Sequence, residues 1–118
     1  MPVMFVYATT GDAAEALRIA RAVVEERLAA CANIIDGMRS VYWWEGVVQE
    51  AGEAVLILKT TDDHLGALIA RVKDLHSYDC PCIEALPVVA GNQGFLDWLA
   101  NETRGSPAGD GARLSDGG

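Results

Sequence analysis

The first element that the hydrophobic pattern predicts is a buried strand over residues 3–8, followed by a turn at Thr9, Thr10 and Gly11. The run is rich in β-branched and aromatic side chains, which favour extended structure. From Asp12 onward, apolar positions recur every three to four residues, and Asp12 with Glu15 forms a variant of the capping box, which predicts a helix. The expected buried face of this helix is Ala13, Ala16, Leu17, Ala20, Val24 and Leu28.

After Cys31 the pattern changes to that of a long β-hairpin. One extended segment reaches Tyr42-Trp43-Trp44, a turn follows at Glu45-Gly46, and a second extended segment runs from residue 47 to residue 60. Because a glycine inside a strand often marks an irregularity, we expect a bulge or break at Gly52.

A second helix, a final strand and a short third helix complete the pattern. Thr61 is the expected cap of the second helix, whose apolar stripe is Leu65, Leu68, Ile69, Val72 and Leu75 and which ends near His76. A loop over 77–81 leads to a strand over 82–90, and Asn92 then caps a helix carrying Phe95, Trp98 and Leu99. The order β-α-β-β-α-β plus a helix indicates the α+β class.

This order predicts a sheet that is covered on one face only. Two right-handed crossovers place both long helices on the same face of four strands, and Pro81 and Pro87 make the last strand an edge strand. However, residues 3–7, 41–44 and 55–58 do not alternate between apolar and polar, so both faces require burial. Trp43 and Trp44 are consecutive and point to opposite faces. We therefore expect copies of the chain to cover one another in a symmetric homo-oligomer.

The composition describes one domain of ordinary size. The 118 residues are 51% hydrophobic and carry a net charge of −8, which excludes a protein that binds the nucleic-acid backbone or an anionic membrane surface. No apolar run approaches the ~20 residues of a membrane helix, and we read no secretion signal, so a cytoplasmic location is expected. Residues 1–104 form the predicted domain, and residues 105–118 a glycine-rich, disordered tail.

Three cysteines supply the main candidate chemistry, namely Cys31, Cys80 and Cys82. In extended chain, Cys80 and Cys82 point to the same side and could share a soft cation, Cu(I) or Zn(II), with His76 or Cys31 as a third donor. The alternative is that both are small buried side chains, and a disulfide between them is disfavoured by strand geometry. Cys31 follows a helix C-terminus, which favours structural burial over a reactive thiolate.

Several other residues have both a structural and a binding interpretation. His76 at its helix end is either a C-terminal cap or a ligand. Lys59 follows an apolar strand and either holds an anion in a cleft between subunits or is solvated. Glu84 and Asp79 either add oxygen ligands or form a charged strand edge that deters pairing.

Six segments together resemble the CutA1 family of divalent-cation tolerance proteins over residues 3–104. They are Cys31-Ala32-Asn33-Ile34, Tyr42-Trp43-Trp44-Glu45-Gly46, Lys59-Thr60, His76-Ser77-Tyr78, and Leu86-Pro87-Val88-Val89-Ala90-Gly91-Asn92 before Leu96-Asp97-Trp98-Leu99. The resemblance implies a ferredoxin-like fold, similar to the PII signalling proteins, assembled as a tight trimer through the hairpin. It also implies a role in tolerance of copper and other divalent metals, without an established reaction. The expected ligand cleft contains Lys59, Tyr42, Trp44, Tyr78 and Glu84.

The chain departs from the family pattern at its expected metal site. The family reads His-Pro-Tyr and then a Val-Pro-Glu-like stretch, where this chain has His76-Ser77-Tyr78 and Cys80-Pro81-Cys82. A cysteine on the first strand and a second histidine, found in bacterial relatives proposed to bind copper, are replaced by Ala8 and Leu75. Any ligand set must therefore be built from Cys80, Cys82, His76 and Cys31.

The expected function is that of a non-enzymatic homotrimer. It binds copper, another divalent or soft metal, or a small anion in clefts between subunits, and the metal is not needed for folding. One alternative is a thiol-dependent enzyme that uses Cys31 or Cys82 with His76. Another is a scaffold that presents loops to a protein partner. No Ser-His-Asp pattern, phosphate-binding glycine loop or dinucleotide fingerprint supports an enzyme.

Overall fold

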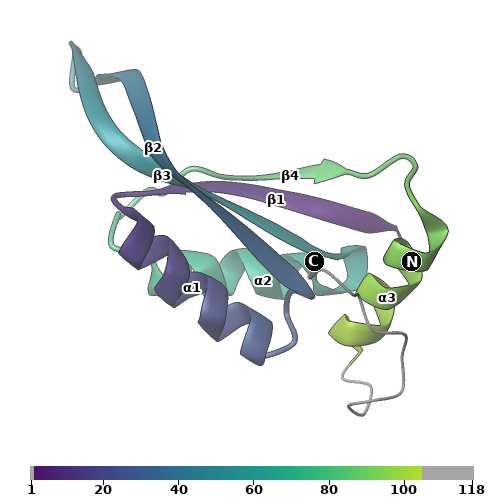
Figure 1. Ribbon diagram of the computed structural model, residues 1–118. Helices are drawn as coiled ribbons and strands as arrows, with labels where there is room; N and C mark the ends of the chain where they lie inside the picture. The colour runs from purple at the N-terminus through teal and green to yellow at the C-terminus, as the bar shows by residue number, and fades with distance from the viewer. Residues whose placement is uncertain (1, 105–118) are drawn as a thin grey trace.

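The computed structural model describes residues 2–104 and shows four strands and three helices in the predicted order (Figure 1). The elements are β1 Val3–Thr10, α1 Ala13–Glu25, β2 Cys31–Trp44, β3 Val47–Thr61, α2 Asp62–Leu75, β4 Ile83–Pro87 and α3 Gln93–Thr103. The ferredoxin-like order with a C-terminal helix is thus confirmed. The predicted disordered tail over 105–118 lies outside the described residues.

The strands form one sheet in the order β2-β3-β1-β4, with every neighbouring pair antiparallel. Since β1 and β2 both run antiparallel to β3, they are parallel to each other, and α1 makes the crossover between them. In the same way, α2 connects the parallel strands β3 and β4 across β1. Both helices lie on one face of the sheet, and β4 is an edge strand, as its prolines predicted (Figure 1). We call the opposite side of the sheet the open face.

The hydrophobic core lies between the sheet and the two long helices. Its fully buried large side chains include Val6, Leu56 and Leu58 from the sheet, Ile19 and Val23 from α1, and Leu68 and Val72 from α2. The face predicted for α1 was therefore partly wrong, because Leu17 is 52% exposed while Ile19 and Val23 are buried. The small side chains of Ala16 and Ala20 let the helix approach the sheet closely, and Ile19 and Val23 insert beside them. The buried face of the helix therefore lies away from Leu17.

The start of α1 confirms the predicted capping arrangement. Asp12 Oδ1 accepts the backbone N–H of Glu15 at 2.8 Å, and Glu15 Oε1 in turn accepts the backbone N–H of Gly11 at 3.1 Å. At the start of α2, Thr61 occupies the predicted cap position, but its hydroxyl donates to Asp63 Oδ1 instead of accepting a helix N–H. The first helix thus has the stronger side-chain cap.

The expected irregularity at Gly52 was misplaced, and the predicted last strand was too long. Gly52 pairs regularly with Arg39 in an unbroken β3, whereas the register shifts on β2 between Ile35 and Met38. Gly37 lies in this shift with φ +78°, a left-handed conformation that glycine adopts without strain. The last strand, β4, spans Ile83–Pro87 and not the predicted 82–90.

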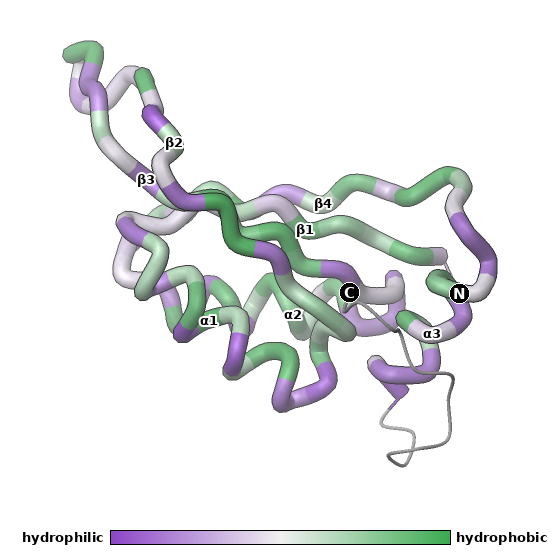
Figure 2. Tube along the Cα trace, viewed as in Figure 1, coloured by the Kyte–Doolittle hydropathy of each residue, from purple (hydrophilic) through white to green (hydrophobic). Residues whose placement is uncertain are grey.

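The β2–β3 hairpin extends beyond the two helices, so its end is uncovered in a single chain (Figure 1). Hydrophobic colour runs along the central strands and returns at the end of this hairpin (Figure 2). Trp43 is 72% exposed and Trp44 57%, and Val41, Val47 and Val48 are also more than half exposed. Apolar surface of this kind indicates an interaction region. Within residues 2–104, no helix is long and apolar enough to cross a membrane.

Candidate functional site

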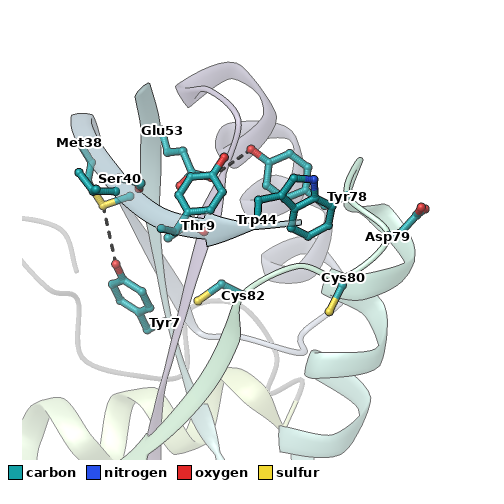
Figure 3. A pocket seen from close by; sticks show the side chains of 12 residues that line it. Tyr7, Thr9, Met38, Ser40, Trp44, Glu53, Tyr78, Asp79, Cys80 and Cys82 are labelled. Carbon is teal, nitrogen blue, oxygen red and sulfur yellow. Dashed lines mark hydrogen bonds between the residues drawn. The ribbon is translucent and has the colours of Figure 1, made fainter. Parts of the chain in front are cut away.

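A pocket of about 710 Å³ lies where the hairpin rises from the open face (Figure 3). It is bounded by β1, β2, β3 and the loop between α2 and β4. The lining residues are Tyr7, Thr9, Met38, Ser40, Val41, Tyr42, Trp44, Glu53, Tyr78, Asp79, Cys80 and Cys82. We call it the open-face pocket. Its volume lies in the range of roughly 300–1,000 Å³ that is typical of small-molecule sites.

The bulge in β2 decides which side chains reach this pocket. Before the bulge, Ile34 pairs with the buried Leu56 and packs against the core. After it, Met38 pairs with Glu53, whose neighbour Ala54 is buried against the helices. Side chains of a strand point alternately to its two faces, and the shift reverses which β2 side chains point to the helices and which to the open face. The open face therefore carries Met38, Ser40, Tyr42 and Trp44 of β2 together with Tyr7 of β1.

His76 fixes the loop that forms the other wall of the pocket. Its side chain is fully buried, its Nε2 lies 2.7 Å from the carbonyl oxygen of Thr9, and its Nδ1 accepts the backbone N–H of Tyr78 at 3.0 Å. Glu15 Oε2 accepts the backbone N–H of Ser77 at 2.8 Å. Both ring nitrogens of His76 are therefore occupied by backbone groups, and its position is that of a loop anchor.

The polar groups of the pocket are paired in two places. The hydroxyl of Tyr7 donates to Met38 Sδ at 3.7 Å, and the hydroxyl of Tyr78 donates to Glu53 Oε2 at 3.0 Å (Figure 3). Burial, together with the hydrogen bond to Glu53 and nearby negative charge, raises the pKa of Tyr78 to about 12. Tyr78 is therefore a neutral hydrogen-bond donor at physiological pH.

The open-face pocket has a negative charge without a compensating base. Glu53 and Asp79 line it, whereas none of its lining residues is lysine, arginine or histidine. Neither carboxylate forms an ion pair with any other described residue in the 2–104 range. An electrostatic field of this sign favours cations over anions.

The two cysteines of the pocket do not converge. Cys80 lies in a bend before β4 and not in a strand, so the same-side geometry expected from their spacing does not arise. In Figure 3 the thiol of Cys82 points away from Cys80. The Cys82 thiol lies 3.6 Å from Glu84 Oε1, and burial and this carboxylate raise its pKa. Cys82 is therefore mainly protonated unless a cation displaces its proton.

The remaining predicted metal ligand, Cys31, lies elsewhere. It begins β2 opposite Lys59, and burial raises the pKa of its thiol although the Lys59 ammonium opposes this. Across residues 2–104, no three side chains of His, Cys, Asp or Glu come together as metal ligands. The expected set of Cys80, Cys82, His76 and Cys31 is thus not assembled within one chain.

The same geometry gives no support to the thiol-enzyme alternative. Activation of a cysteine requires a lowered pKa or an adjacent base, whereas the pKa values of Cys31 and Cys82 are raised. The imidazole of His76 is held by the backbone of Thr9 and Tyr78 and accepts no proton from either thiol.

The structure separates the residues expected in the ligand cleft into two groups. Tyr42, Trp44 and Tyr78 line the open-face pocket, whereas Lys59 and Glu84 do not. The Lys59 ammonium lies 5.4 Å from the ring centres of both Phe5 and Phe95. Sequence reasoning missed Tyr7, Met38 and Glu53. For Met38 the signal was Gly37, since a bulge there changes the face to which the following residues of β2 point.

Comparison with known proteins gives consistent matches over this fold. The family described as "CutA1 divalent ion tolerance protein" matches residues 4–102. The "Divalent-cation tolerance protein CutA" of Thermus thermophilus is 52% identical over 85 residues, covering 72% of this chain and 82% of that protein. The crystal structure of CutA1 from Oryza sativa has a TM-score of 0.86 at 46% identity and covers 90% of this chain and 97% of its own.

The relatives differ in length and in location. The rice "Protein CutA 1, chloroplastic" is 46% identical, and this chain covers 60% of its length. A structure from Archaeoglobus fulgidus, with a TM-score of 0.83 and 40% identity over 86% of this chain and 98% of that one, is described as a periplasmic divalent cation tolerance protein. The cytoplasmic location expected from the sequence therefore stays a prediction. With the fold, the hairpin and these matches in agreement, the chain belongs to the CutA1 divalent ion tolerance protein family.

Proposed function

We propose that this protein is a non-enzymatic homotrimer that binds a soft or divalent metal cation at the open-face pocket and acts in the response to metal ions. The observation that carries the proposal is the lining of that pocket. It contains two carboxylates and two thiols, and no basic side chain. Carboxylate oxygens and thiolate sulfurs are ligands for divalent and soft cations.

The trimer is supported by the uncovered hairpin. Trp43 and Val48 pair across the hairpin on the face turned away from Glu53, and each is more than half exposed. Within the described residues, α1, α2 and α3 all lie away from this end of the hairpin (Figure 1), so a second copy of the chain is the simplest cover. Three copies in a closed ring would cover the exposed apolar side chains of each hairpin in the same way, and a trimer is what the family resemblance implies.

Assembly also bears on metal affinity, because a single chain does not bring its thiols together. A cation held in one chain would have Cys82 as its thiol donor, with Glu53 or Asp79 as oxygen donors. A neighbouring copy would supply further donors in a cleft between subunits. Release of the Cys82 proton on binding makes metal affinity rise with pH, because its pKa is raised.

The test is an anaerobic competition titration with Cu(I), and separately with Zn(II), on the purified oligomer. The combined Cys80→Ser and Cys82→Ser variant is expected to lose most of the affinity, and the matched Cys31→Ser variant to keep it. Native mass spectrometry of the same samples gives the oligomeric state. Unchanged metal affinity in the double variant would contradict the proposed site, and a monomer at micromolar concentration would contradict the trimer.

A further inference from the structure

Aromatic rings dominate the walls of the open-face pocket. Tyr7 comes from β1, Tyr42 and Trp44 from β2, and Tyr78 from the loop after α2. Four rings from three separate parts of the chain therefore surround one cavity whose only charged lining residues are Glu53 and Asp79. The pocket thus combines aromatic walls with a negative charge.

This combination also suits a second kind of ligand, an organic cation. A metal ion needs several donor atoms converging at short distances, and residues 2–104 of a single chain bring together no three His, Cys, Asp or Glu side chains of this kind. A substituted ammonium ion needs no converging donors, because its charge is spread over its alkyl groups and is weakly hydrated. It is attracted by aromatic faces within about 6 Å and by carboxylates nearby.

The carboxylate is also held in place. The hydroxyl of Tyr78 donates to Glu53 Oε2, which orients the Glu53 carboxylate and leaves its charge in place. The Met38 side chain, which accepts the Tyr7 hydroxyl, adds a polarisable apolar surface beside Glu53, its partner on β3 (Figure 3). An apolar substituent on the ligand would contact this surface.

We propose that the open-face pocket binds organic ammonium ions that carry apolar substituents, with Tyr42, Trp44 and Tyr78 as the aromatic walls and Glu53 as the counter-charge. The site uses the cavity proposed for metal and shares Glu53 with it. It differs in depending on the aromatic rings, whereas the metal depends on the thiols.

The test compares choline with its neutral carbon analogue, 3,3-dimethylbutan-1-ol, on the full-length protein. The three indole N–H resonances of Trp43, Trp44 and Trp98 are followed by NMR during each titration. Choline is expected to shift the Trp44 resonance in a saturable manner and to bind about tenfold more tightly than the alcohol. Equal binding of the two compounds, or a choline shift confined to Trp43 or Trp98, would overturn the proposal.

Matched variants test whether choline affinity depends on the residues that line the pocket or on similar residues outside it. Glu53→Gln is expected to weaken choline binding about fivefold, whereas Glu50→Gln, on the other face of β3, leaves it unchanged. Trp44→Leu is expected to weaken it about tenfold. Trp43→Leu is the control, because it also removes an exposed hairpin indole but none that lines the pocket. Wild-type affinity in both Glu53→Gln and Trp44→Leu would contradict the assignment.

The proposed metal function can fail without affecting this one. The combined Cys80→Ser and Cys82→Ser variant is expected to bind choline like the wild type, while its metal affinity falls. Loss of choline binding in this thiol variant would show that the rings and Glu53 do not form the site. Metal binding without choline binding in the wild type would remove the ammonium proposal and leave the metal site standing.

Discussion

The Nδ1 atom of His76 accepts the backbone N–H of Tyr78 at 3.0 Å. A backbone N–H can only donate, so Nδ1 carries no proton, and the proton of the neutral ring lies on Nε2. Nε2 then donates to the carbonyl oxygen of Thr9 at 2.7 Å. One imidazole thereby joins the end of β1 to the loop that supplies Tyr78, Asp79, Cys80 and Cys82 to the open-face pocket.

Replacing this ring should destabilise the protein strongly. His76→Ala leaves a buried carbonyl and a backbone N–H without partners and opens a cavity, so we expect the free energy of unfolding to fall by about 3 kcal/mol. Urea denaturation at a fixed protein concentration measures this. His64→Ala is the control, because His64 is partly exposed and bonds only side chains of its own helix start. Equal losses in the two variants would exclude the anchoring role.

Glu15 should make stability depend on pH in the acid range. Burial alone would raise its pKa, but hydrogen bonds from Ser77 and Gly11 and the nearby His76 outweigh burial and hold it below the ordinary 4.5. A depressed carboxyl pKa gives stability that is present above the unfolded value and lost as the pH falls through the folded value. Glu15→Gln should cost about 2 kcal/mol at pH 7 and progressively less as the pH falls through the folded pKa of Glu15, where the wild type also becomes protonated.

The measurement is the free energy of unfolding of both proteins from pH 7 to pH 3. Glu25→Gln serves as the control, because Glu25 forms only an exposed pair with Arg21 at 4.0 Å. A constant difference between wild type and Glu15→Gln over this range would show that the ionised carboxylate is not what stabilises the loop.

Sequence periodicity was sufficient for the fold and insufficient for the details of packing. Asp12, Asn92 and the change from apolar runs rich in β-branched and aromatic residues to a period of 3.6 located the strands and helices, because these signals are local. The buried face of α1 depends on how closely the helix approaches the sheet. That distance is set by Ala16 and Ala20 together with the strands opposite, so local sequence could not distinguish Leu17 from Val23 as the core residue.

The aromatic residues of the site were predictable from the family resemblance. Tyr42, Trp44 and Tyr78 were expected in a ligand cleft, and all three line the pocket. Met38 was not, because its orientation follows from the bulge at Gly37 rather than from an irregularity at Gly52. The thiols of Cys80 and Cys82 were expected to converge, but the bend that contains Cys80 precedes the strand.

The position of the bulge can itself be tested. Gly37 has φ +78°, so Gly37→Ala should cost about 1–2 kcal/mol of unfolding free energy even though open space surrounds its Cα. Gly52 is also surrounded by open space but lacks a positive φ, so Gly52→Ala should be neutral or slightly stabilising. Thermal or urea denaturation of the two variants measures this, and a larger loss for Gly52→Ala would move the irregularity back to β3.

The assembly depends on the side chains at the end of the hairpin. Trp43 is 72% exposed in one chain, so burying it under a neighbouring subunit would stabilise association by on the order of 3 kcal/mol per subunit. We therefore expect Trp43→Ala to raise the concentration at which the oligomer dissociates by about a hundredfold or more, as measured by sedimentation equilibrium. Leu17→Ala is the control, because Leu17 is also exposed but lies on α1, away from the hairpin. If both variants associated like the wild type, the hairpin would not be the contact between subunits, and the cover for its apolar side chains would have to come from a different partner.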